Sequence, residues 1–277
     1  MGVNFDRPQV MGILNVTPDS FSDGGAFNTP GRALERVAQM IAEGADIIDI
    51  GGESTRPGAQ PVTQAQEIER VVPLVEAIRA RFDVPVSVDT SKAGVMRAAV
   101  AAGADMLNDV RALRDADALT VAAQLKVPVC LMHMQGEPRT MQTRPQYGDV
   151  VSEVLDFLAQ RVQACVNAGL ARDRLLIDPG FGFGKNLAHN LLLLKHLSRF
   201  KALGLPLLVG VSRKSMIGTI TDKRVDQRLY GSLAAASLAL WQGADIVRVH
   251  DVAATVDVLK VCQAVRQAPE AGAGDAL

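Results

Sequence analysis

The tripeptide Gly-Ala-Asp occurs three times in this chain, at residues 44–46, 103–105 and 243–245. Each copy stands between a segment with the apolar spacing of a helix and a short apolar run. An apolar run bounded by turn residues is typical of a buried parallel strand. A motif that recurs at the same place in the local pattern indicates a repeated unit. The chain is therefore predicted to repeat a helix-to-strand unit.

Eight predicted strands alternate with eight predicted helices along the sequence. The strands are residues 10–15, 46–50, 84–89, 105–110, 128–134, 175–178, 207–211 and 245–250. The helices are residues 30–44, 64–82, 92–102, 118–126, 150–168, 187–203, 227–242 and 252–266. This alternation predicts a parallel sheet, and eight units in one chain of 277 residues favour a single-domain (β/α)8 TIM barrel over a doubly wound sheet. Residues 1–267 are expected to form this domain, and residues 268–277 a disordered tail.

The composition of the chain indicates which kinds of partner to expect. With 29 basic and 30 acidic residues, the net charge is −1, so we expect no nucleic-acid or membrane-surface partner. The longest apolar helical pattern, residues 233–241, is far short of the roughly 20 residues of a membrane span. Three scattered cysteines make no disulfide framework, and the first residues show no targeting pattern. We therefore expect a cytoplasmic protein that binds small molecules.

Polar side chains stand where several predicted strands end. Asp89, Asn108 and Asp178 each follow an apolar run, and a buried carboxylate is costly unless it is paired. One such residue alone could cap a helix, but three around a barrel suggest a ligand rich in hydrogen-bond donors. A bicyclic ring with an aminopyrimidinone edge would fit, because it presents adjacent N–H groups to a carboxylate. The sequence thus predicts a binding site at the carboxyl ends of the strands.

Two further groups of polar residues leave alternatives open. Arg248 and His250 lie two apart on a strand and share a face with Ile246. They suggest an anion site, since the last two loops of such barrels often bind phosphate, although a salt bridge at the edge of the barrel is the plainer interpretation of either residue alone. For residues 212–215, a phosphate contact and a solvated loop are equally favoured.

Two further motifs predict neither a nucleotide loop nor a zinc site. The glycines of residues 180–184 match neither the Walker pattern nor G-x-G-x-x-G, so they do not predict a nucleotide loop. Cys130 and His133 are three apart on a strand and point to opposite faces, which argues against a shared zinc ion. Two long connections, residues 16–28 and 135–149, exceed the usual length of about 2–6 residues and are predicted to be functional.

Seven motifs together closely resemble the dihydropteroate synthase family. They are residues 13–25, 49–58, 87–90, 108–109, 178–183, 212–215 and 248–251. The resemblance spans nearly the whole chain, and the first two motifs are long and specific. It implies a transferase of folate biosynthesis, the target class of the sulfonamides. Such an enzyme condenses 6-hydroxymethyl-7,8-dihydropterin diphosphate with 4-aminobenzoate to give 7,8-dihydropteroate and diphosphate.

The resemblance also implies roles for individual residues. Asp89, Asn108, Asp178, Lys214 and Met132 match the pterin-binding set. This assigns Lys214 to the pterin carbonyl rather than to a phosphate. Thr55, Arg56, Pro57, Phe21, Phe183 and Ser215 match the 4-aminobenzoate site.

The same resemblance implies a diphosphate site and a cofactor. Asn15, Thr55, Arg248 and His250 match the diphosphate group, with Asn15 a direct ligand of Mg²⁺. One protein ligand suffices physically, because Mg²⁺ keeps waters and binds substrate phosphates. Asp23, Arg56, Arg248 and His250 are the expected catalytic residues.

A homodimer is the expected assembly, because residues 233–241 carry apolar and small side chains over most of a helix circumference. The family is commonly dimeric through its later helices. Two alternatives to the synthase remain at this point. One is a pterin-dependent methyltransferase-like barrel, which would share the Asp and Asn pocket but need neither Arg56 nor Ser215. The other is a non-catalytic pterin-binding paralogue, against which the intact first two motifs argue.

Overall fold

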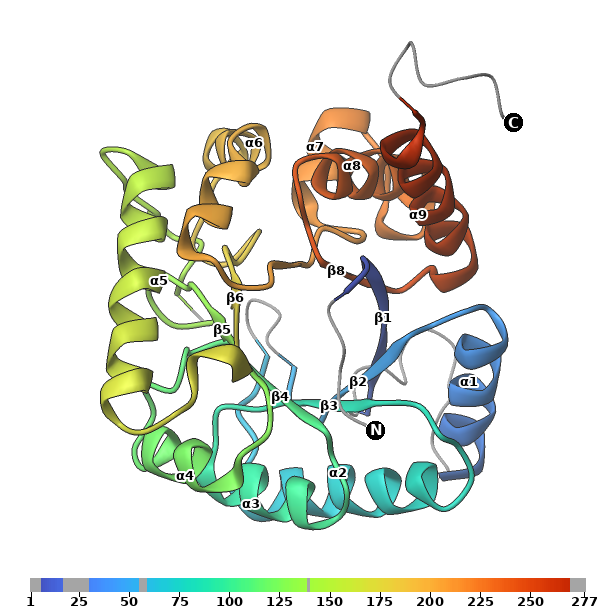
Figure 1. The fold of residues 1–277 in the computed structure, drawn as a ribbon, viewed down its shortest axis with the longest axis vertical. Helices are drawn as coiled ribbons and strands as arrows, with labels where there is room; N and C mark the ends of the chain where they lie inside the picture. Colours follow the sequence, from blue (N-terminus) through green and yellow to red (C-terminus); the bar gives the residue numbers. More distant parts are fainter. Residues whose placement is uncertain (1–5, 17–29, 55–58, 139, 270–277) are drawn as a thin grey trace.

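The described part of the chain forms a barrel of parallel strands inside a ring of helices (Figure 1). In the computed structural model, these described residues are 6–16, 30–54, 59–138 and 140–269. The sheet has eight strands in the order β6-β5-β4-β3-β2-β1-β8-β7. A bridge between Ile177 and Leu207 joins β6 to β7. Because this bridge connects the two ends of the sheet, the predicted (β/α)8 barrel is confirmed.

The strands are short and their bounds lie within one or two residues of most predictions. They are β1 (Gln9–Asn15), β2 (Ile47–Gly51), β3 (Val86–Asp89), β4 (Met106–Asp109), β5 (Val129–Met132), β6 (Leu175–Asp178), β7 (Leu208–Val209) and β8 (Ile246–Val249). The helices around them are α1 (Pro30–Ala42), α2 (Gln64–Arg79), α3 (Ala93–Ala101), α4 (Ala118–Leu125), α5 (Val150–Asn167), α6 (Leu187–Lys195), α7 (Ser215–Thr221), α8 (Leu229–Trp241) and α9 (Val252–Gln267). Helix α2 begins with a capping box formed by Thr63 and Gln66.

The repeated Gly-Ala-Asp has one structural role in its three copies. Its glycine always has a left-handed backbone, with φ of 96° at Gly44, 106° at Gly103 and 102° at Gly243. Its aspartate accepts a hydrogen bond from a backbone amide where the neighbouring strand begins. Asp46 accepts from Val10 at 2.8 Å, Asp105 from Val86 at 2.8 Å, and Asp245 from Leu207 at 2.7 Å. The glycine of the motif therefore ends a helix, and its aspartate binds the start of the neighbouring strand.

Apolar side chains fill the barrel on both sides of its strands. One buried cluster consists of side chains from seven strands, namely Met11, Ile47, Met106, Cys130, Leu176, Leu208 and Ile246. A larger cluster lies between the strands and the helices. Along each strand, side chains alternate between these two sides. At the carboxyl ends of the strands, polar side chains replace the apolar ones. The candidate active site therefore lies at these ends.

Two helix predictions were wrong. Residues 187–203 do not form one helix, because α6 ends at Lys195 and a 3-10 helix follows over Leu197–Leu203. The buried Leu197 and Phe200 are three residues apart, which matches the three residues per turn of a 3-10 helix. Helix α7 was missed. Its sequence, Ser-Met-Ile-Gly-Thr-Ile-Thr, is rich in β-branched residues and contains glycine, so it has low helix propensity.

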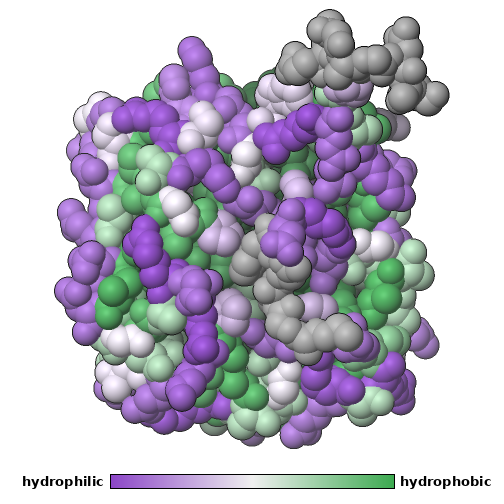
Figure 2. Space-filling view, in the orientation of Figure 1, coloured by the Kyte–Doolittle hydropathy of each residue, from purple (hydrophilic) through white to green (hydrophobic). Residues whose placement is uncertain are grey.

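The outer surface is mixed in polarity. On the face shown in Figure 2, hydrophilic residues form most of the outline and hydrophobic ones gather between them. Within the described ranges, no helix is long and apolar enough to cross a membrane.

Candidate active site

The predicted pterin residues lie side by side where the strands end. Asp89 on β3 and Asn108 on β4 are register partners in the sheet. Met132 on β5 and Asp178 on β6 are register partners as well. Since β4 and β5 are also paired, these four residues follow one another around the mouth of the barrel. They therefore lie at the strand ends, as the sequence predicts, and their roles in binding stay predictions.

Arg248 connects this row to the opposite side of the barrel. Its Nε donates to Oδ2 of Asp49 at 2.7 Å, and its Nη2 donates to Oδ2 of Asp89 at 3.0 Å. Burial works against the guanidinium charge, but the two carboxylates more than compensate and raise the pKa of Arg248. The pKa of Asp89 is raised to about 7 by burial, against the opposing effect of Arg248. In this structure Arg248 thus forms salt bridges, the alternative to an anion site that its sequence position also allows.

Asp178 and Lys214 form the second charged part of the site. Oδ1 of Asp178 accepts the amide of Gly180 at 2.7 Å, and burial raises the pKa of this carboxyl to about 6. Lys214 immediately precedes α7, and its Nζ lies 4.4 Å from the centre of the Phe183 ring. Burial, together with the charge of Arg248, lowers the pKa of Lys214 to about 8. A carboxylate and a cation are therefore available for a ligand with both N–H and carbonyl groups, and Ser215 is exposed at the start of α7.

His250 follows β8 and is held by the connection after β7. Its Nδ1 lies 3.0 Å from Oγ of Ser212, and its backbone amide donates to the same oxygen at 3.2 Å. Burial lowers the pKa of His250 to about 3, with the charges of Arg213 and Arg248 acting in the same direction. The imidazole is therefore neutral at pH 7. Arg213 ties the two connections together through a bidentate contact with Asp251, at 2.6 and 3.0 Å.

Asn15, the predicted metal ligand, ends β1 and is half-buried. Its register partner is Gly51, and a Cβ built on that glycine would lie 3.2 Å from Oδ1 of Asn15. Because Gly51 has no side chain, space remains beside the amide oxygen. Within the described ranges, no group of three or more His, Cys, Asp or Glu residues could hold a metal ion. An oxygen ligand with room beside it fits a hydrated Mg²⁺ ion that takes its other ligands from water and phosphate.

An apolar wall lies beside the charged groups. Met132 belongs to a buried cluster with Val110, Met134 and Met141, and Phe183 packs against it. Cys130, by contrast, lies in the interior cluster of the barrel. His133 contacts Nζ of Lys185 at 2.9 Å instead. The prediction that Cys130 and His133 share no zinc is consistent with these separate surroundings.

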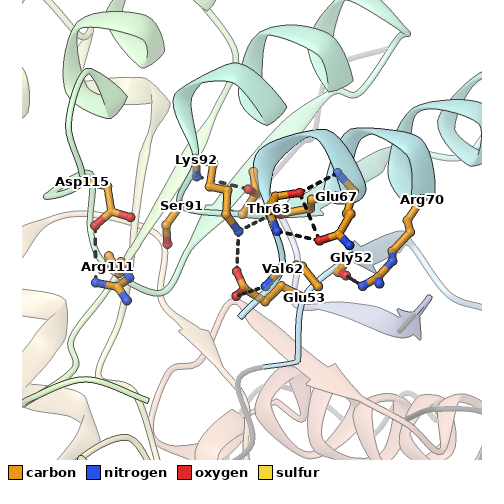
Figure 3. Close-up of polar contacts among 12 residues, drawn as sticks. Gly52, Glu53, Val62, Thr63, Glu67, Arg70, Ser91, Lys92, Arg111 and Asp115 are labelled. Atoms are coloured by element: carbon orange, nitrogen blue, oxygen red, sulfur yellow. Dashed lines mark hydrogen bonds and ion pairs between the residues drawn. The ribbon is translucent and has the colours of Figure 1, made fainter. Parts of the chain in front are cut away.

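A cluster of charges supports the connection between β2 and α2 (Figure 3). Nζ of Lys92 lies 2.5 Å from Oε2 of Glu53 and 2.5 Å from Oε2 of Glu67. Oε1 of Glu53 accepts the amide of Val62 at 3.2 Å, so this side chain bridges the two ends of the connection. Arg70 donates to the carbonyl of Gly52 at 2.9 Å. Helices α2 and α3 thereby fix the residues on either side of positions 55–58.

Several predicted site residues lie outside the described part of the chain. They are Phe21, Asp23, Thr55, Arg56 and Pro57. The long connection predicted over residues 16–28 also falls there, apart from Val16. Their roles in the 4-aminobenzoate and diphosphate sites stay predictions.

Three residues of the site were not predicted from the sequence. Asp49 is fully buried and pairs with Arg248, and its position inside an apolar strand was a usable signal because a buried charge needs a partner. Ser212 contacts His250, although its motif predicts only a phosphate contact or a solvated loop. Lys185 binds main-chain carbonyls, and no local pattern indicates such a contact.

Comparisons with known proteins agree with this geometry. The profile of the pterin binding enzyme family matches residues 11–250. Dihydropteroate synthase of Haemophilus influenzae is 57% identical over 261 residues, which cover 94% of this chain and 95% of that protein. The Yersinia pestis dihydropteroate synthase, solved with a sulfonamide drug complex, superposes with a TM-score of 0.93 at 54% identity, covering 96% of this chain and 97% of that one.

A third relative was solved with a small molecule. It is the Xanthomonas albilineans dihydropteroate synthase with 4-aminobenzoic acid, at a TM-score of 0.91 and 54% identity over 96% of each chain. These similarities span the barrel and all of the strand ends described above. The chain belongs to the pterin binding enzyme family and, within it, to the dihydropteroate synthases.

Proposed function

We propose that the described strand ends carry out the dihydropteroate synthase reaction of this family, the condensation of 6-hydroxymethyl-7,8-dihydropterin diphosphate with 4-aminobenzoate. The observation that carries the proposal is the row Asp89, Asn108, Met132 and Asp178 on consecutive strands, with Arg248 reaching Asp89 from β8. The relationship to a synthase solved with 4-aminobenzoic acid supports the second substrate. Products are 7,8-dihydropteroate and diphosphate.

The pterin ring would lie across the mouth of the barrel. The buried Asp178 and the half-buried Asp89 are carboxylates that can accept its N–H groups, and Asn108 can both donate and accept. Lys214 can donate to the ring carbonyl. Met132, in its apolar cluster, supplies a wall for the flat face of the ring. Charge-assisted hydrogen bonds of this kind contribute roughly 1.5–3 kcal/mol each.

The diphosphate would lie beside β1 and β8. Arg248 offers a permanent positive charge, and neutral His250 can donate from its ring to a phosphate oxygen. Asn15 would hold Mg²⁺, which when bound neutralises charge on the diphosphate. Thr55 is proposed for the same group on the resemblance alone. These groups bind the leaving group where its negative charge increases.

The reaction needs separated charges to be stabilised and two molecules to be aligned. The C–O bond between the pterin methylene and diphosphate breaks, and its electron pair leaves with the diphosphate. The dihydropterin ring delocalises the positive charge on the methylene carbon, and the amine of 4-aminobenzoate supplies the pair of the new C–N bond. The amine loses one proton to solvent. An arylamine is already a neutral nucleophile, so positioning and electrostatics are the tasks left to the protein.

The 4-aminobenzoate would approach from the open side of the site. Phe183, which packs on the Met132 cluster, and the exposed Ser215 at the start of α7 are proposed contacts among the described residues. Phe21, Thr55, Arg56 and Pro57 are proposed from the resemblance, and Asp23 is proposed as a catalytic residue on the same basis.

A homodimer is proposed through α8 and α9. Leu238 and Trp241 on α8, and Val261 and Val265 on α9, are each more than half exposed, and the two helices pack against each other. Several exposed apolar side chains on two neighbouring helices are typical of an interface. The cytoplasmic location stays a prediction from the sequence.

The direct test is release of diphosphate when the two substrates are mixed with the protein and Mg²⁺. We expect stoichiometric formation of 7,8-dihydropteroate, and loss of both products when either substrate is omitted. Release of diphosphate without 4-aminobenzoate would indicate a hydrolase. No release at all, with intact pterin binding, would indicate a binding protein.

A further inference from the structure

Three alternate glycines shape the connection after β6. Gly180, Gly182 and Gly184 have φ values of 71°, 80° and 62°, in the left-handed region that glycine enters without strain. A side chain at Gly180 would collide with the carbonyl oxygen of His133, and one at Gly184 with the carbonyl oxygen of Gln135. This connection, residues 180–184, is therefore packed tightly against the residues that follow β5.

The ammonium of Lys185 lies inside this packing and is only 3% exposed. Its Nζ donates to the carbonyl oxygens of Gly180 at 2.9 Å and Phe183 at 3.0 Å. It also lies 2.9 Å from Nδ1 of His133 and 3.4 Å from the carbonyl oxygen of the same residue. An ammonium has three protons, and four acceptors surround this one. Lys185 therefore has no proton to offer a ligand without breaking a contact inside the protein.

His133 completes the surroundings of Lys185 from the β5 side. Burial lowers the pKa of His133 to about 2, with the charge of Lys185 acting in the same direction, so the ring is neutral and Nδ1 can accept. The ring packs edge-on against Phe157, with centroids 4.8 Å apart. The backbone amide of His133 donates to the carbonyl of Asp178 at 2.9 Å. Lys185 thus joins the end of β5 to the end of β6.

The contacts of Lys185 lead directly to proposed substrate residues. Gly180, whose carbonyl it binds, donates its amide to Asp178 at 2.7 Å. Phe183, whose carbonyl it also binds, places its ring 4.4 Å from Nζ of Lys214. The connection is held from the other side by Asn190, whose Oδ1 accepts the amide of Gly182 at 2.7 Å.

We propose that Lys185 is a positioning residue of the synthase: it touches neither substrate, but fixes the 180–184 connection so that Asp178 faces the pterin and Phe183 faces the 4-aminobenzoate. The inference rests on the proposed function for the roles of these two residues. It assigns a role to a buried cation that the proposed reaction does not use.

The charge of Lys185 has a second, separable effect. Burial raises the pKa of Asp178, and the cations that oppose this are Lys214, Lys185 and Arg248, together with the amide of Gly180. Burial lowers the pKa of Lys185 to about 7, so its charge is present at the lower pH at which Asp178, with a pKa of about 6, becomes protonated. Removing that charge should therefore move protonation of Asp178 to higher pH. This effect depends on charge alone, whereas the KM for 4-aminobenzoate depends on the placement of Phe183 and so reports positioning separately.

The test compares Lys185→Met, which removes charge and donors, with Lys185→Gln, which keeps two N–H donors without charge. Binding of 6-hydroxymethylpterin is measured by calorimetry from pH 5 to 9, and steady-state kinetics follow with both substrates. We expect Lys185→Met to weaken pterin binding by about tenfold, because a displaced Asp178 would lose roughly one of its charge-assisted hydrogen bonds to the pterin. In both variants the pH at which binding is half lost should rise, and the KM for 4-aminobenzoate should increase.

The matched control is Lys201→Met. Lys201 pairs with Asp245 before β8, at the opposite end of the barrel, so its loss should leave pterin binding and its pH dependence unchanged. Should Lys185→Met fail to fold, His133→Asn, which keeps one acceptor for the ammonium, is expected to weaken pterin binding without moving its pH midpoint. A folded Lys185→Met protein with wild-type pterin affinity, pH midpoint and KM would overturn the proposal. Failure of the wild-type protein to bind pterin would instead overturn the proposed function.

Discussion

Arg248 donates a hydrogen bond to Asp89 across the mouth of the barrel, with 3.0 Å between Nη2 and Oδ2. The contact joins a residue proposed for the diphosphate to one proposed for the pterin ring. Arg248 is also anchored from below, because its Nε donates to the fully buried Asp49. A cation held by one buried carboxylate can exchange its second partner for a substrate phosphate without leaving its place. Pterin recognition and stabilisation of the leaving group thus share one side chain.

Asp49→Asn should therefore reduce both stability and turnover. Removing one partner of a buried ion pair costs about 3–5 kcal/mol. Because Arg248 keeps Asp89 as a partner, we expect a loss of about 3 kcal/mol in the free energy of unfolding. Urea denaturation measures this loss, and steady-state kinetics should show a lower kcat. Asp245→Asn, at the other end of the barrel, is the control and should leave kcat unchanged. An Asp49→Asn protein with wild-type kcat would show that the anchor has no catalytic consequence.

Acid should weaken pterin binding. Burial raises the pKa of Asp89 to about 7 and that of Asp178 to about 6, and a protonated carboxyl can no longer accept two N–H groups. The affinity for a pterin analogue should fall as the pH decreases from 8 to 5, as calorimetry can measure. The contribution of these two groups to folding stability changes with pH in the opposite direction to pterin affinity. Because their folded pKa exceeds the unfolded value of about 4, it is largest at low pH and is lost as the pH rises through 6 to 7. Binding that is constant over this range would contradict the assignment of these carboxylates to the pterin.

The repeated Gly-Ala-Asp shows what sequence can predict in this protein. The recurrence of the motif between helix and strand was enough to predict the repeated unit, whereas the contact of its aspartate with the neighbouring strand became clear only from the structure. The strand-end residues Asp89, Asn108 and Asp178 were predictable because parallel strands bring their carboxyl ends to one edge. The alternation of helices and strands is thus almost enough to predict which strands are neighbours in the barrel.

Contacts made across the barrel could not be predicted in this way. Arg248 and Asp49 are 199 positions apart, and nothing near either residue specifies the other. Lys185 and His133 follow the adjacent strands β6 and β5, but they are 52 positions apart, and nothing near either residue specifies the other. Helix α7 was missed for a different reason, since its weak local propensity is overridden by the burial of Met216 and Ile217. Side-chain partners depend on how distant segments pack in three dimensions, whereas the positions of the strand ends follow from the local pattern.

Lys92→Met should destabilise the connection between β2 and α2. Glu67 is fully buried, and without Lys92 its charge would be left uncompensated, so we expect a loss of about 3 kcal/mol in the free energy of unfolding. The double variant Lys92→Met, Glu67→Gln removes that buried charge and should recover much of the loss. Urea denaturation of the wild type and the two variants measures the loss and its recovery. If the double variant were as unstable as Lys92→Met alone, the loss would have to come from Glu53 or from packing.

The proposed homodimer can be tested at its apolar surface. Leu238→Glu and Val261→Glu each place a charge on an exposed position of α8 or α9, which should cost little in a monomer but much in an interface. Light scattering at micromolar concentration is expected to give twice the 29.5 kDa chain mass for the wild type and the single chain mass for the double variant. A wild-type protein of single mass would refute the dimer.

Asp178→Asn and Arg56→Ala should fail in different ways, because they are assigned to different substrates. Asp178 ends β6 and accepts the amide of Gly180, and its Asn variant would present an amide donor to the N–H groups of the pterin. With roughly 1.5–3 kcal/mol for a charge-assisted hydrogen bond, pterin affinity should fall by about one to two orders of magnitude. Arg56 is assigned to 4-aminobenzoate by resemblance, so Arg56→Ala should leave binary pterin binding nearly intact.

The measurements are titration of a pterin analogue into each variant and steady-state kinetics with both substrates. Arg56→Ala should then lower turnover and raise the KM for 4-aminobenzoate, because its charge serves only the second substrate. Asp178→Asn should lose affinity already in the binary titration, before 4-aminobenzoate is added. If Arg56→Ala lost pterin binding as severely as Asp178→Asn, or if Asp178→Asn bound pterin normally, the division of the site into a barrel floor for pterin and a separate set of residues for 4-aminobenzoate would be wrong.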